Sequence, residues 1–118
     1  MAPMEENRRD DPRFAVFLYV ECIEPEAAPI HVQDLSAGGF LVRGNIVAGQ
    51  GGILHARFRV HPSSGDMLVS AHGRVMHSRR DGPNSLFGVK IEGFGSPEEE
   101  RAYQVYVEEL SATRPASL

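Results

Sequence analysis

Hydrophobic and polar residues alternate along much of the chain, and this alternation predicts β-strands. The clearest example runs from Gly52 to His61, where every second residue from Leu54 to Val60 is apolar and those between are histidine or arginine. Such a pattern is typical of a strand that buries one face against a core. Segments rich in apolar and β-branched residues predict further strands at 14–23, 30–35, 40–43, 67–75 and 87–91.

The period changes from two to that of a helix after residue 95. Ser96 has the position of an N-cap, Pro97 that of the first helical residue, and Glu99 that of a capping box. These signals predict one amphipathic helix of about 14 residues that packs against the sheet or against another subunit. Its apolar stripe consists of Ala102, Tyr103, Tyr106, Val107 and Leu110.

Six strands joined by turns and followed by one helix are most simply arranged as a small antiparallel β-barrel that closes its own edges, with a C-terminal α-helix. The 118 residues suffice for one domain. We expect a flexible arginine-bearing arm at 1–13, the barrel and helix at 14–112, and a disordered tail at 113–118.

Composition excludes several classes of protein. No apolar run is long enough to span a membrane, and the N-terminus lacks the apolar stretch of a secretion signal. The single cysteine, Cys22, cannot form an internal disulfide, so a reducing cytoplasm is the expected compartment. A net charge of −4 argues against a protein that binds long nucleic acids.

An arginine group precedes the first strand and consists of Arg8, Arg9 and Arg13. Guanidinium groups pair bidentately with phosphate oxygens or with the O6 and N7 edge of guanine, and they stack on bases. Asp10 and Asp11 also allow a bland interpretation, a solvated tail whose charges neutralise one another locally. The arginines alone leave both interpretations open.

A second group lies between the second and third predicted strands, where Asp34 and Ser36 precede Gly38 and Gly39. These residue types commonly form a turn in which side chains cap backbone amides. They also suit a ligand site: Asp34 accepts hydrogen bonds from guanine N1–H and the exocyclic amine, Ser36 contacts a phosphate or sugar, and Gly39 lets the backbone approach the ligand.

The two groups together are far more specific. Arg9-x-x-x-Arg13, followed about twenty residues later by Asp34-x-Ser36-x-x-Gly39, resembles the paired motifs of the PilZ domain family. The resemblance implies a six-stranded antiparallel barrel with a C-terminal helix, which agrees with the strand pattern. It also implies binding of cyclic di-GMP, with the two arginines wrapping the ligand and the other three residues holding it from the barrel surface.

The resemblance extends beyond the motifs. Gly88–Ile91 is similar to the glycine-led last strand of the family, although Ile91 stands where the family often has phenylalanine. In such domains the residue before the first motif arginine influences how many ligand molecules bind. Here that residue is Arg8, which favours a stacked pair of nucleotides. Whether Arg79 or Arg80 also contacts the ligand is left open.

The resemblance therefore implies a cytoplasmic receptor without enzymatic activity or cofactor, in which the arm orders over cyclic di-GMP and an unidentified downstream protein reads the change. A nucleotide-independent adaptor for a motility or secretion partner is the alternative. No catalytic arrangement is evident, and a zinc site is not expected, because by strand parity only His55 and His61 share a face. The sequence allows either a monomer or a homodimer.

Overall fold

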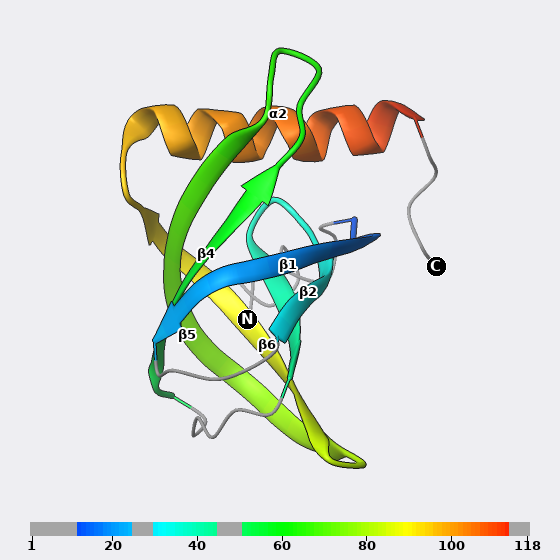
Figure 1. Ribbon diagram of the computed structural model, residues 1–118, viewed down its shortest axis with the longest axis vertical. Coiled ribbons are helices and arrows are strands. Elements are labelled where there is room, and N and C mark those ends of the chain that lie inside the picture. Colours follow the sequence, from blue (N-terminus) through cyan, green and yellow to red (C-terminus); the bar gives the residue numbers. More distant parts are fainter. Residues whose placement is uncertain (1–11, 25–29, 45–50, 114–118) are drawn as a thin grey trace, which may run out of the picture.

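The computed structural model describes residues 12–24, 30–44 and 51–113. Within these residues six β-strands precede one helix, and the expected fold, an antiparallel barrel with a C-terminal helix, is confirmed (Figure 1). The elements are β1 Phe14–Glu24, β2 Ile30–Leu35, β3 Gly39–Gly44, β4 Ile53–Val60, β5 Met67–Asp81, β6 Asn84–Phe94 and α2 Pro97–Thr113.

The strands form a closed barrel in the order β1-β2-β3-β6-β5-β4, and every neighbouring pair is antiparallel. Closure matters because it leaves the described strands no long unpaired edge. The strands of the β5–β6 hairpin have 15 and 11 residues, longer than expected, and the hairpin projects away from α2 (Figure 1). Consequently Arg79 and Arg80 belong to β5 rather than to the turn.

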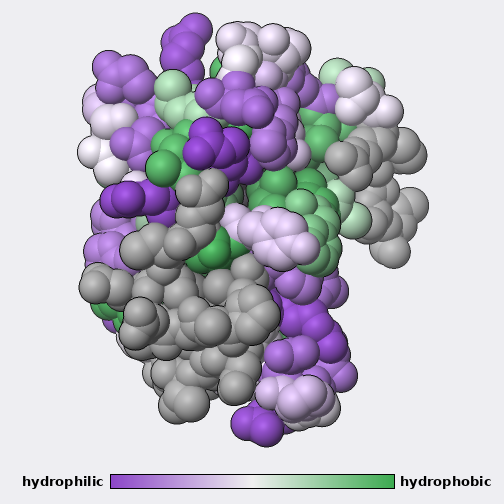
Figure 2. Space-filling view, viewed as in Figure 1, coloured by the Kyte–Doolittle hydropathy of each residue, from purple (hydrophilic) through white to green (hydrophobic). Residues whose placement is uncertain are grey.

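Strand alternation fills the barrel as the pattern predicts. Residues of β4 are buried at every second position, with Phe58 fully buried against Phe40 of β3. The continuous apolar run of β1 proves less uniform: Phe14 and Leu18 face the core, whereas Phe17 and Tyr19 are 59% and 69% exposed. Figure 2 shows hydrophobic surface near the middle of the face on which β1 lies in front.

Helix α2 lies across one end of the barrel (Figure 1) and buries Tyr103, Tyr106, Val107 and Leu110, four members of the predicted stripe. The helix has 17 residues rather than about 14. It therefore ends at Thr113, one residue beyond the expected domain boundary. The rest of the expected arm and tail, residues 1–11 and 114–118, lies outside the described residues.

The N-terminus of α2 differs in one detail from a capping box. The Glu99 N–H donates to Ser96 Oγ at 3.2 Å, as predicted for an N-cap. The Glu99 carboxylate, however, accepts from Ser96 Oγ at 3.0 Å and from the backbone N–H of Ser70 in β5 at 2.6 Å. The same side chain therefore caps the helix and attaches it to the barrel.

Candidate functional site

The turn Ser36–Gly39 connects β2 to β3, and its first residue closes it. The Ser36 N–H donates to the Gly39 carbonyl oxygen at 2.9 Å, and Ser36 Oγ donates to the same oxygen at 3.4 Å. Ser36 is only 2% exposed. In this ligand-free structure its hydroxyl therefore shapes the turn, as expected for a side chain that caps its own backbone.

The packing of two neighbouring strands explains the glycine at position 39. A Cβ at this position would lie 2.4 Å from the carbonyl oxygen of Val89, because β3 runs beside β6 with Gly39 opposite Lys90. No side chain fits so close to a backbone oxygen. Glycine is therefore required here because β3 and β6 pack closely, whereas the sequence suggested that it lets the backbone approach a ligand.

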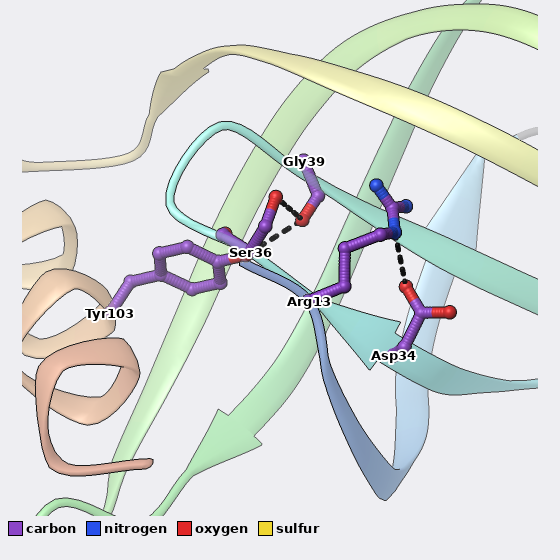
Figure 3. Close-up of polar contacts among 5 residues, drawn as sticks. All are labelled: Arg13, Asp34, Ser36, Gly39 and Tyr103. Atoms are coloured by element: carbon purple, nitrogen blue, oxygen red, sulfur yellow. Dashed lines mark hydrogen bonds and ion pairs between the residues drawn. The ribbon is translucent and has the colours of Figure 1, made fainter. Parts of the chain in front are cut away.

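Tyr103 of α2 is the site residue that sequence reasoning missed. Its hydroxyl donates to the carbonyl oxygens of Ser36 at 2.7 Å and Gly39 at 3.1 Å (Figure 3). The helical spacing predicted only that Tyr103 faces the core. A buried tyrosine hydroxyl needs a hydrogen-bond partner, so a tyrosine in the apolar stripe was the one sequence signal that it contacts a polar group. Burial, the largest influence, raises the pKa of Tyr103, and the hydroxyl therefore keeps its proton.

Arg13 and Asp34, which the sequence predicted as site residues from separate motifs, lie together. Arg13 Nε donates to Asp34 Oδ1 at 3.2 Å across 21 residues of sequence. The pair is brought together because β1 starts one residue after Arg13 and the β1–β2 register sets Ala15 opposite Asp34. Figure 3 shows this pair and Tyr103 on either side of the turn.

The Arg13–Asp34 pair is open to solvent, with side chains 44% and 24% exposed. The contact joins Arg13 Nε to Asp34 Oδ1, so within the described residues the two terminal guanidinium nitrogens and the second carboxylate oxygen are available to a ligand. Arg8 and Arg9 lie outside the described residues.

Arg79 and Arg80 are not part of this pair. The register sets them opposite Leu86 and Ser85 of β6, towards the far end of the long hairpin. Nearer the middle of that hairpin, Gly88 lies under the His77 imidazole, whose Nε2 atom would be 2.2 Å from a Cβ at position 88. A methyl group at position 88 would therefore have to displace the His77 imidazole, a side chain able to rotate away.

The histidine prediction requires a correction. His55 and His72 are cross-strand partners in β4 and β5, and their rings stack at 5.4 Å, so they share a face that parity along one strand could not identify. Among the described residues, no three histidine, cysteine, aspartate or glutamate side chains are grouped to hold a metal ion. In the same residues, no helix is both long and apolar enough to cross a membrane.

Comparisons with known proteins agree with this fold. The family model described as PilZ domain matches residues 7–109, a range that includes both motifs. No curated protein matches the chain. Among solved structures, "Structure of Bacillus subtilis Inhibitor of motility (MotI/DgrA)" is similar, with a TM-score of 0.68 and 18% identity over 91% of this chain and 53% of that one.

The chain thus spans about half the length of that Bacillus subtilis protein, and at this identity the likeness shows the fold alone. The family match rests instead on the sequence, over most of its length. With the closed barrel and the terminal helix in place, and the family model matched over residues 7–109, the chain belongs to the PilZ domain family.

Proposed function

We propose that this domain binds cyclic di-GMP at the Arg13–Asp34 pair and the adjoining turn, and passes the signal to a partner protein. The observation that carries the proposal is the meeting of the two motifs: a guanidinium from one and a carboxylate from the other, 3.2 Å apart and open to solvent. A cyclic dinucleotide offers phosphodiester acceptors and guanine N–H donors, which match these two groups.

The turn supplies further donors. Ala37 and Gly38 are exposed, and within the described residues their backbone N–H groups have no acceptor. Successive backbone N–H groups in a turn attract anions. We therefore assign these two amides to a phosphate. Ser36 and Gly39, predicted as direct contacts, act in this proposal chiefly by building the turn.

Opening the Arg13–Asp34 pair costs little. An exposed ion pair contributes about 0–1 kcal/mol, whereas a dissociation constant of about 1 μM corresponds to about 8 kcal/mol. On binding, the protein therefore gives up one weak ion pair and gains several contacts with the ligand. In the same proposal Arg8 and Arg9 close over the ligand, Arg8 favours a stacked pair, and the cytoplasm is the setting.

Isothermal titration of the full chain with cyclic di-GMP tests this function. Arg13→Ala and Asp34→Ala should each weaken binding at least about tenfold, which is about 1.4 kcal/mol, because each removes a charged partner of the ligand. Their melting temperatures should change little, because neither side chain belongs to the core.

Arg57→Ala is the matched control. Arg57 is exposed, its Nε donates to Ser70 Oγ at 3.2 Å, and it belongs to β4, which lies across the closed barrel from β3. It should bind like the wild type. Absence of heat and of any thermal shift with the wild type would reject the proposal.

That rejecting outcome would favour the second candidate, a nucleotide-independent adaptor. Phe17 and Tyr19 support it, because exposed aromatic side chains on a rigid strand are enriched at protein interfaces. Phe17 also stacks on His31 at 4.2 Å, which preorganises this part of the β1 surface.

A further inference from the structure

Helix α2 is attached to the barrel through polar contacts at three places along its length. Near its N-terminus, Glu99 accepts from the Ser70 N–H at 2.6 Å. Near its C-terminus, the Glu109 carboxylate accepts from the Ser63 N–H at 2.8 Å and from Ser63 Oγ at 2.6 Å. Between them, the helix contacts the Ser36–Gly39 turn.

This central contact provides hydrogen-bond donors for most of the carbonyl groups of the turn. Tyr103 donates to the carbonyl oxygens of Ser36 and Gly39, and Gln104 Nε2 donates to that of Ala37 at 3.2 Å. The carbonyl oxygen of Gly38 accepts from the Ile91 N–H of β6 at 2.9 Å. All four carbonyl groups of the turn are therefore engaged, three of them by α2.

The consequence concerns the opposite side of the turn. When the carbonyl groups of a short turn are fixed, the orientation of its peptide planes is fixed, and so are the directions of its N–H groups. We propose that Tyr103 and Gln104 are positioning residues for the nucleotide site, so that ligand affinity is coupled to the docking of α2. This inference rests on the proposed function and extends it to regulation.

Coupling of this kind is reciprocal. If docking of α2 strengthens ligand binding, ligand binding strengthens docking of α2 by the same factor. A partner that displaces α2 would thus weaken ligand binding.

Tyr103 also belongs to the core, where the centroid of its ring lies 5.3 Å from that of Phe94 and 6.4 Å from that of Phe58. Tyr103→Phe separates the two roles, because it keeps the ring and removes only the hydroxyl. Gln104→Ala is a second variant that leaves the core intact, since Gln104 is not among the buried residues.

Titration with cyclic di-GMP gives the first readout. Tyr103→Phe loses two hydrogen bonds to the turn and should raise the dissociation constant about fivefold. Gln104→Ala loses one and should raise it about twofold. Glu109→Gln is the control: the glutamine amide oxygen can still accept from Ser63, so α2 stays docked and its contacts with the turn are untouched, and the variant should keep the wild-type affinity. Equal weakening in the control, or unchanged binding by Tyr103→Phe, would overturn the inference.

Amide hydrogen exchange in the absence of ligand gives the second readout. The Ser36 N–H, which donates to Gly39 at 2.9 Å, should exchange faster in Tyr103→Phe and at the wild-type rate in Glu109→Gln. Unchanged exchange at Ser36 in Tyr103→Phe would contradict positioning. If the wild type binds no cyclic di-GMP, the proposed function fails, and this exchange measurement alone decides whether the helix positions the turn.

Discussion

At the scale of single residues, the candidate site shows that one motif can carry two kinds of constraint. Asp34 is partly exposed and faces Arg13, as a ligand-binding residue should. Ser36 and Gly39 are buried and serve the turn and the β3–β6 contact. The spacing of the motif predicts all three as ligand contacts, but spacing cannot separate residues that contact a ligand from residues that shape the backbone.

Gly39→Ala tests the structural role of the glycine. The new Cβ would meet the Val89 carbonyl oxygen at 2.4 Å, and because backbone must move, the free energy of unfolding should fall by about 1–3 kcal/mol. Gly93→Ala in β6 is the control, since its Cβ would meet the His72 imidazole, a side chain able to rotate away. Urea unfolding of both variants measures the difference; equal losses would contradict this account.

At the scale of elements, local sequence predicts well where local physics decides. The Ser96-Pro97 start of α2 follows from capping, because the first N–H groups of a helix need an acceptor. The strand β4 follows from strict alternation. Lengths are less predictable: β5 continues to Asp81 because its cross-strand partner β6 also continues, and pairing between strands is not written in either segment alone.

Ser96→Ala should destabilise the domain by about 1 kcal/mol, because it removes the hydroxyl that accepts from the Glu99 N–H. Thermal unfolding, followed by circular dichroism, measures the effect. Ser111→Ala, on the exposed surface near the other end of α2, is the matched substitution and should cause no comparable loss. A Ser96 variant as stable as the Ser111 variant would show that the cap contributes nothing.

At the scale of the whole molecule, closure of the barrel and docking of α2 bring together segments far apart in sequence. Arg13 meets Asp34 across 21 residues, and Tyr103 meets Ser36 across 67. At the far end of the helix, hydrogen bonds from the Ser63 hydroxyl and N–H lower the pKa of Glu109. This contact therefore links stability to pH.

The sign of that link follows from the lowered pKa. The unfolded chain binds the Glu109 proton more tightly, so the contribution is present above about pH 4.3 and is lost as pH falls through the folded-state value. We expect the melting temperature of the wild type to fall more steeply than that of Glu109→Gln between about pH 5 and pH 3. Parallel curves in differential scanning calorimetry would contradict this prediction.

The sequence by itself determined the fold class, the order of the elements, the apolar stripe of α2 and the family's two motifs. It could do so because alternation, helical period, capping and turn chemistry act between residues close in the chain. It also predicted the positions Arg13 and Asp34 as parts of one site, through the resemblance of the paired motifs.

Only the tertiary structure decided what those positions touch. The Tyr103 hydroxyl, the Val89 carbonyl oxygen beside Gly39 and the His55–His72 stack all depend on which strands become neighbours and where α2 comes to lie. The physical reason is that register and helix docking are set by burial over the whole barrel, a sum to which each local segment contributes only a part.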